Sequence, residues 1–155
     1  MILPDIRQSR TWDCGITAAQ IVLRCLRRRI TPEILTRLNA SPIDGTDPRA
    51  LESALRAAGL GVQSGEMTWD DLRHHTSSGR PVVCLVNADG VGHYVVIGAI
   101  DCGRARLQDP AAGPVEISRR AFIPTWRDVD RWGAHYRQFG LTAYRFALKN
   151  AYNSV

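Results

Sequence analysis

Cys14 is the residue of this chain whose type and position are best suited to chemistry. It stands directly before an apolar helical pattern that begins at about Gly15. The unpaired N–H groups and the positive end of the macrodipole at a helix N-terminus favour an anion, and the thiolate is the reactive form of cysteine. Asp13 is a good N-cap type, and Gly15 lets a ligand approach the backbone. The sequence therefore predicts that Cys14 is a nucleophile.

The other three cysteines lack this setting. Cys25 lies within the helical pattern and Cys84 within an apolar run, so both are predicted to be small buried hydrophobic residues. Cys102 precedes a glycine and is expected in a turn. The absence of a CxxC pair argues against a structural zinc site, and the chain length argues against a disulfide framework. We expect no metal and no cofactor.

A cysteine nucleophile needs a base within hydrogen-bond reach and a third group that orients this base. Of the four histidines, His74 and His75 are expected on a polar helix face, and His135 lies in a segment without a clear pattern. His93 follows Gly92 at the start of an apolar strand, where its ring can project from the strand end. We therefore predict that His93 is the base; a histidine satisfied within the core is the alternative.

Asp109 is the predicted orienting group. It ends the next strand, just before Pro110, and two antiparallel strands joined by a short turn place the start of one beside the end of the other. An Asp before Pro is also a common turn former, which is the structural alternative. Acyl transfer further needs donors for the developing oxyanion. The backbone N–H of Cys14 and the side-chain amide of Gln8 are the candidates.

Three short blocks of sequence, in this order and at this spacing, resemble the papain-like peptidase family that processes bacteriocin precursors after a double-glycine leader. The blocks are Gln8 with Asp13-Cys14-Gly15, then Gly92-His93-Tyr94-Val95-Val96, then Asp109-Pro110-Ala111-Ala112-Gly113. The segment 45–60 resembles the family's middle helix, and Phe122 with Trp126 resembles its tail. The resemblance covers about residues 5–130.

This resemblance implies an α+β papain-like cysteine peptidase fold, in which N-terminal helices pack on a C-terminal antiparallel sheet and the nucleophile opens the central helix. It implies that Cys14 is the nucleophile and His93 the general base and acid, with Asp109 orienting His93. It also implies that Gln8 donates to the oxyanion. Ile16-Thr17 departs from the Pro-Ala that many members have there, which leaves the catalytic set unchanged.

The transporter-linked members of the family carry membrane and ATPase domains that this sequence does not contain. We therefore expect a stand-alone peptidase domain that acts on a peptide or protein, with a leader peptide among the candidate substrates. A transpeptidase, deamidase or amide ligase would use the same acyl-enzyme and is the second interpretation. A catalytically silent peptide-binding module is the third, although loss of the cysteine would be its usual mark.

Composition is typical of an ordinary globular domain. The chain has 155 residues, 45% hydrophobic and 23% charged, which suits a single domain with one core. No apolar run approaches the ~20 residues that span a bilayer, and no signal peptide is recognisable, so a cytoplasmic protein is expected. The net charge is +5 without a basic stripe interleaved with aromatics, which argues against nucleic-acid binding. The sequence does not indicate an oligomeric state.

Capping residues and apolar spacing predict helices over about 15–29, 32–38, 48–58 and 69–76, and a short helix over 118–126 interrupted by Pro124. Strands are predicted over 62–63, 82–86, 93–100, 105–108, 115–117 and 143–148, with a turn or loop over 87–92. Helices followed by a strand meander are the α+β pattern. Residues 127–140 have no clear pattern, 131–155 are expected to form a C-terminal extension whose last residues, 150–155, fray, and 1–155 are expected to form one domain.

Overall fold

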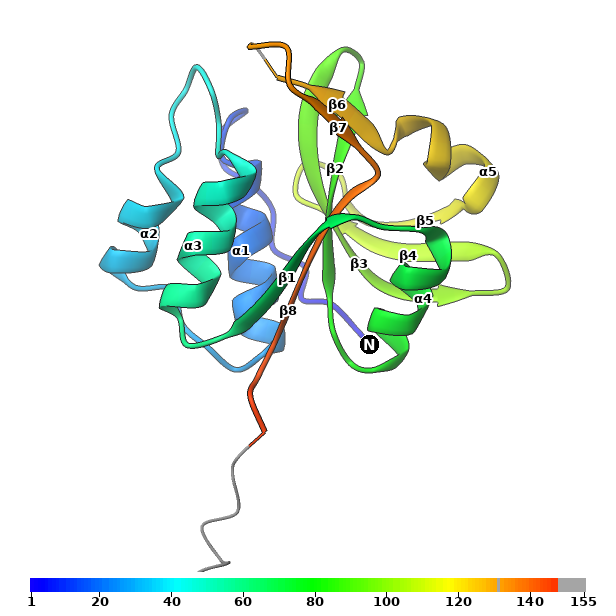
Figure 1. Cartoon of the computed structure of the whole chain (residues 1–155), viewed down its shortest axis with the longest axis horizontal. Coiled ribbons are helices and arrows are strands. Elements are labelled where there is room, and N and C mark those ends of the chain that lie inside the picture. Colours follow the sequence, from blue (N-terminus) through cyan, green and yellow to red (C-terminus); the bar gives the residue numbers. More distant parts are fainter. Residues whose placement is uncertain (131, 148–155) are drawn as a thin grey trace, which may run out of the picture.

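The computed structural model of the chain describes residues 1–130 and 132–147. Within these residues a six-stranded antiparallel sheet has the order β1-β8-β2-β3-β4-β5 (Figure 1). Its strands are β1 (Gly61–Glu66), β2 (Val82–Ala88), β3 (Val91–Asp101), β4 (Arg104–Asp109), β5 (Gly113–Ser118) and β8 (Phe139–Tyr144). A separate pair is formed by β6 (Arg127–Val129) and β7 (His135–Arg137). The predicted α+β fold with an antiparallel sheet is confirmed.

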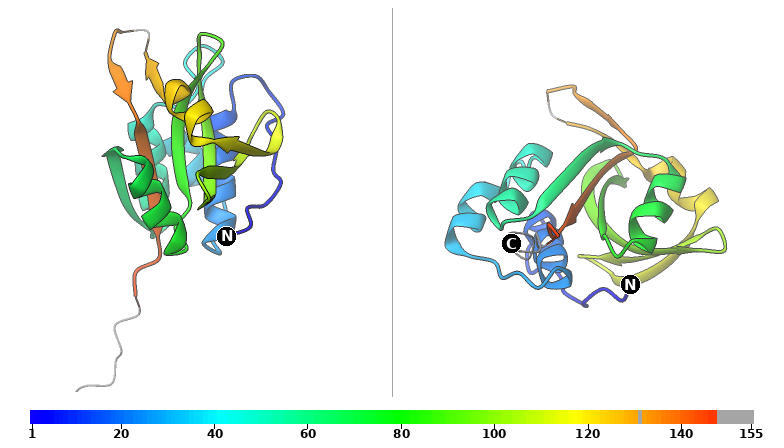
Figure 2. Two further views of the ribbon diagram at one scale, coloured as in Figure 1. Left: turned by 90° about the vertical axis from the view of Figure 1, so that its right-hand side faces the viewer. Right: turned by 60° about the horizontal axis from the view of Figure 1, so that its bottom comes forward.

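Helices cover both faces of this sheet. The helices are α1 (Cys14–Cys25), α2 (Pro32–Leu38), α3 (Pro48–Ala57), α4 (Trp69–Ser77) and α5 (Arg119–Phe122), the last continued by the 3-10 turn η1 (Ile123–Thr125). Helices α1–α3 lie on one face, and α4 and α5 lie on the other (Figures 1 and 2). None of these helices in the described part of the chain is long and apolar enough to cross a membrane.

The two faces of the sheet have separate cores, and β2 shows why. Val83 and Leu85 pack with the helices α1–α3, whereas Val82, Cys84 and Val86 pack with α4 and α5. Successive side chains of a strand point to opposite faces, so a continuous apolar run is required when both faces are covered. The apolar run that predicted this strand is therefore the signature of its central place in the sheet.

Helix α1 is shorter than predicted. It ends at Cys25, and Arg27 follows with a left-handed φ of 55°. The N–H of Arg27 binds the Arg24 carbonyl at 3.1 Å and the N–H of Arg28 binds the Leu23 carbonyl at 2.7 Å, which is a Schellman motif. This motif usually has Gly at the left-handed position, and the arginine there hid the helix end from sequence reasoning.

The next three helices begin where the capping residues predicted. The side chains of Thr31, Asp47 and Thr68 each accept a backbone N–H of the first turn of α2, α3 and α4. At α4 the cap is reciprocal, because the Asp71 carboxylate also accepts the Thr68 N–H at 2.7 Å. These caps fix the starts of α2, α3 and α4.

The hairpin of β2 and β3 is longer than predicted. Its turn consists of Asp89 and Gly90, with φ of 52° and 85°, rather than the whole segment 87–92. Two left-handed residues match the right-handed twist of the flanking strands, so the ladder continues to the pair Ala88–Val91. Asn87 and Gly92, which are typical of loops, concealed this extension.

Strand β8 comes from the segment that was expected to be a C-terminal extension. It covers Phe139–Tyr144, earlier than the predicted 143–148, and it pairs with both β1 and β2. Leu141 and Ala143 are fully buried in the core of α1–α3. Residues 139–144 are thus an interior strand of the sheet, paired on both sides, while the predicted fraying of 150–155 lies outside the described residues.

Candidate active site

The start of α1 carries Cys14, which is its first residue and is 8% exposed. Asp13 occupies the N-cap position, but its carboxylate does not cap the helix. It accepts the Ser9 hydroxyl and the Arg10 N–H instead, both at 3.1 Å. Alone among α1–α4, this helix therefore has no side-chain cap within the described residues. Its first-turn N–H groups are left for a ligand.

Gly15 is required by close packing at the same helix start. A Cβ at this position would lie 2.5 Å from the Cβ of Thr46, in the loop between α2 and α3. The Thr46 carbonyl in turn accepts the Tyr94 hydroxyl at 2.8 Å. Tyr94 follows His93 in β3, so this chain of contacts holds the start of α1 at a fixed place relative to the histidine. Thr46 and Tyr94 were not assigned this role from the sequence, because no local pattern joins residues so far apart.

His93 and Asp109 meet across neighbouring strands, as predicted. His93 Nε2 lies 2.7 Å from Asp109 Oδ1, and the side chains are only 14% and 23% exposed. Burial alone would lower the pKa of His93, but the hydrogen bond to Asp109 and the interaction with the Cys14 thiol outweigh it and raise the pKa to about 9. His93 therefore interacts with both of the predicted partners, and Nδ1 is the ring nitrogen that the hydrogen bond to Asp109 leaves unoccupied.

Asp109 is held by its own turn. Its Oδ1 also accepts the N–H of Ala111 at 2.8 Å and that of Ala112 at 3.4 Å. Burial raises the pKa of the carboxyl, yet the hydrogen bond from His93 and these backbone donors outweigh burial, so the pKa lies below its usual value. One oxygen of Asp109 thus bonds both to its own turn and to His93.

Gln8 lies beside this turn. Its backbone N–H binds the Pro110 carbonyl at 2.8 Å, and its side-chain Nε2 donates to the Arg10 carbonyl at 2.7 Å. Its Oε1 is buried without a partner among the described residues. Since an amide nitrogen carries two hydrogens, one remains for a further acceptor. The segment that carries Gln8 also contacts Asp13 through Arg10, which links it to the start of α1.

The remaining histidines and cysteines differ in part from expectation. His75 was expected on a polar face, but it is 6% exposed, and burial lowers its pKa. His74 and His135 are exposed. Cys84 is fully buried as predicted, whereas Cys25 is only half-buried and Cys102 lies exposed in a turn.

The strands β6 and β7 form an arm that packs next to His93. Asp128 of β6 accepts the side-chain N–H of Asn87 at 3.2 Å, and its carboxylate lies against Gly92, where a Cβ would clash. The arm, the turn between β2 and β3, and the loop between α2 and α3 all lie at the end of the molecule where α1 begins (Figure 1). Sequence reasoning missed this arm, because its strands are three residues long and without a distinct pattern.

Chemically, this arrangement can hold a thiolate beside an imidazolium. A histidine with a pKa near 9 is protonated at neutral pH, and the adjacent carboxylate stabilises that charge. A thiolate at an uncapped helix start, next to a proton donor, can attack a carbonyl carbon and then protonate the leaving group. No metal is needed for this chemistry.

A cysteine at the start of the central helix, facing a histidine and an acid on an antiparallel sheet, is the arrangement of the papain-like cysteine peptidases. The chain is a cysteine peptidase of this class. It belongs to the peptidase C39 family, whose model matches residues 3–129.

The chain is also similar to other proteins in sequence and in fold. An uncharacterized protein of Methanothermobacter thermautotrophicus is 31% identical over 117 residues, which are 76% of this chain and 78% of that protein. The lactococcin-G-processing and transport ATP-binding protein LagD of Lactococcus lactis is 23% identical over 128 residues, which are 80% of this chain but 18% of LagD. The structure of a double glycine motif protease from an AMS/PCAT transporter, solved in complex with the leader peptide, superimposes with a TM-score of 0.71. That likeness has 19% identity and covers 94% of this chain and 93% of the other.

Proposed function

We propose that this peptidase hydrolyses a peptide bond through a thioester on Cys14, with His93 as general base and acid, Asp109 orienting His93, and Gln8 donating to the oxyanion. The observation that carries the proposal is the setting of His93: its Nε2 is 2.7 Å from Asp109, and Asp109 and the Cys14 thiol together raise its pKa to about 9 against the effect of burial.

In the first step, the Cys14 sulfur attacks the peptide carbonyl carbon and a C–S bond forms. The carbonyl oxygen takes the negative charge and accepts the backbone N–H of Cys14 and the second Nε2 hydrogen of Gln8. The C–N bond then breaks, and the imidazolium of His93 gives its proton to the leaving amine. The amine product departs and the acyl group stays on the sulfur as a thioester.

In the second step, His93, now neutral, takes a proton from water as the water oxygen attacks the thioester carbon. The C–S bond breaks, the carboxylic acid product leaves, and the thiolate and imidazolium are restored. Throughout the cycle Asp109 stays ionised, which its lowered pKa favours, and it keeps the His93 ring in one orientation.

The substrate that we propose is a peptide or protein. A leader peptide that ends in two glycines is the first substrate to test, because the structurally similar double glycine motif protease was solved with a leader peptide. We also propose that residues 1–155 form one peptidase domain and that it acts in the cytoplasm. The sequence alone supports the cytoplasmic location.

Substitution of the nucleophile tests the proposed function. Cys14→Ala should abolish cleavage of a fluorogenic peptidyl-Gly-Gly-aminomethylcoumarin while circular dichroism and Tm stay near those of the wild type. Cys25→Ala is the matched control, because it makes the same change on the same helix at a half-buried position. Retained cleavage by Cys14→Ala would reject the assignment of the nucleophile.

Alkylation gives a measurement that needs no substrate. At neutral pH, iodoacetamide should modify Cys14 before the other three thiols, as mapped by mass spectrometry of tryptic peptides. Burial raises the pKa of Cys25 and Cys84, and the hydrogen bond with Asp101 raises the pKa of the exposed Cys102. Faster modification of Cys102 than of Cys14 would contradict an activated thiol at the helix start.

A further inference from the structure

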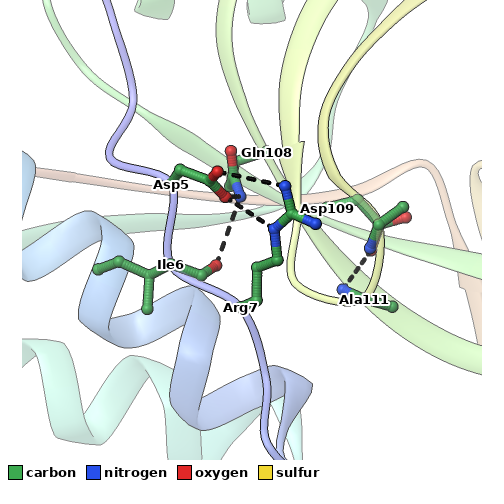
Figure 3. A network of polar contacts seen from close by, with 7 residues as sticks. Asp5, Ile6, Arg7, Gln108, Asp109 and Ala111 are labelled. Atoms are coloured by element: carbon green, nitrogen blue, oxygen red, sulfur yellow. Dashed lines mark hydrogen bonds and ion pairs between the residues drawn. The ribbon is translucent and has the colours of Figure 1, made fainter.

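The extended segment that precedes α1 is tied to the sheet at several places before it reaches Gln8. Leu3 packs against Gly98 of β3, where a Cβ would lie 2.7 Å from Leu3 Cγ. Asp5 and Ile6 then reach Gln108, and the N–H of Gln8 binds Pro110. Figure 3 shows this network around Asp5, Arg7 and Gln108, next to Asp109. The segment thus runs along the strand whose end carries Asp109.

Gln108 is the buried member of this network. It is 1% exposed and precedes Asp109 in β4. Its Nε2 donates to Asp5 Oδ1 at 2.8 Å and lies 3.4 Å from the Ile6 carbonyl oxygen. Since the nitrogen carries two hydrogens, both have an acceptor, and both acceptors belong to the segment before α1. A buried amide with these bonds has one favourable position, so it fixes the segment against β4.

Arg7 strengthens the same attachment from outside. Its Nε and Nη2 bind the two Asp5 oxygens at 3.1 and 3.2 Å, and its guanidinium lies against Gly113, at the end of the turn that begins with Asp109. The Arg7 hydrogen bonds, and then that from Gln108, keep the pKa of Asp5 below its usual value, so the acceptor stays ionised at neutral pH. Gln8 follows directly after this pair.

We propose that Gln108 is a positioning residue of the peptidase reaction. It holds the Asp5–Gln8 segment against β4 and thereby sets the Gln8 amide at the place where the oxyanion forms. This inference rests on the proposed function, in which Gln8 donates to the oxyanion. Gln108 itself does not touch the reacting atoms, and its effect on catalysis passes through Gln8.

A double-mutant cycle on kcat tests the proposal, with peptidyl-Gly-Gly-aminomethylcoumarin as the substrate. Gln108→Met keeps the volume and removes both N–H bonds. Gln8→Ala removes one oxyanion donor, and loss of such a donor lowers kcat by roughly 100-fold. Gln108→Met only displaces this donor, so it should lower kcat by about 10-fold to 100-fold with little change in KM. In the Gln8→Ala background, Gln108→Met should lower kcat no further, because the residue through which it acts is gone.

Thr142→Val is the matched control. It also removes a buried side-chain bond to a backbone carbonyl in this sheet, from Thr142 Oγ1 to the Pro81 oxygen at 3.0 Å, away from Gln8. It should lower Tm and leave kcat unchanged. Equal losses of kcat for Gln108→Met in both backgrounds, or a loss no greater than that of Thr142→Val, would overturn the positioning role.

A second pair of variants gives an answer even where Gln108→Met does not fold. Asp5→Ala removes the exposed acceptor of Gln108 together with the Arg7 pair, whereas Arg7→Met removes only the pair. Asp5→Ala should lower kcat more than Arg7→Met does, and equal values would overturn the proposal. Cleavage that does not depend on Cys14 would instead refute the proposed function, so the two failures are distinguishable.

Discussion

Asp109→Asn isolates the charge of the acid from its geometry. Asp109 Oδ1 accepts from both His93 and the Ala111 N–H, and an asparagine can keep one oxygen in that place. The substitution therefore retains the orientation of the imidazole and removes the negative charge 2.7 Å from its nitrogen. Any change in the titration of His93 then reports the electrostatic contribution.

The expected size follows from the pKa of His93. The rise from 6.5 to about 9 is about 2.5 pKa units and corresponds to about 3 kcal/mol in favour of the imidazolium, at about 1.36 kcal/mol per unit. Burial opposes this rise, so the interactions of His93 with Asp109 and Cys14 together favour the imidazolium by more than this amount. Removal of a neighbouring unit charge lowers a pKa by about 1 to 3 units. The pKa of His93 in Asp109→Asn should therefore fall to about 6 to 8.

Two measurements check this expectation without a known substrate. An NMR pH titration of the His93 ring gives the pKa directly, and the pH dependence of Cys14 alkylation by iodoacetamide shows whether the imidazolium sustains the thiolate at neutral pH. Asp101→Asn is the control, because it makes the same change at the far end of β3. If the His93 pKa in Asp109→Asn stays near 9, the assignment of Asp109 as its electrostatic partner is refuted.

Three further outcomes are expected. Gly15→Ala should leave the protein folded but lower kcat by up to about 100-fold, because the added Cβ displaces Thr46 or the start of α1. Adding Thr46→Gly to this variant should restore part of the lost kcat. An unchanged kcat in Gly15→Ala would contradict this reasoning. Because the folded pKa of His93 is raised, its stabilising contribution is full below pH 6.5 and lost between 6.5 and about 9. The difference in unfolding free energy between the wild type and His93→Gln, measured in urea, should therefore shrink as the pH rises from 6.5 to about 9, and a growing difference would contradict this. Thr68→Ala should cost about 1 kcal/mol of stability through the lost α4 cap and leave kcat unchanged, so a loss of activity would show an unforeseen link to the site.

Local signals predicted most of the fold. Thr31 and Asp47, each followed by Pro, fixed two helix starts, and the apolar run of β2 marked a strand that is covered on both faces. Errors occurred where the deciding contact is distant or the residue atypical. Arg27 ends α1 where glycine is usual, and β8 was misplaced because it is defined by pairing with β1 and β2.

The candidate site was predictable because each of its residues stands in a recognisable local context. Cys14 is the first residue of α1, His93 lies near the start of β3 and Asp109 ends β4, and the hairpin of β3 and β4 brings the last two together. The residues that hold them in place have no such context. Thr46, Tyr94 and Gln108 act through contacts across the molecule that only the folded chain reveals.

The position of β8 between β1 and β2 has a consequence for the order in which the sheet is completed during synthesis. Strand β1 pairs only with β8 among the described strands, so it has no neighbour until residues 139–144 have left the ribosome. Until then, the nascent chain exposes the edges of β1 and β2 that later pair with β8, a strand that is made more than fifty residues after β2. A shortened version cut at residue 129, where the family match ends, would keep every proposed catalytic residue and still lack the strand that joins β1 to the rest of the sheet.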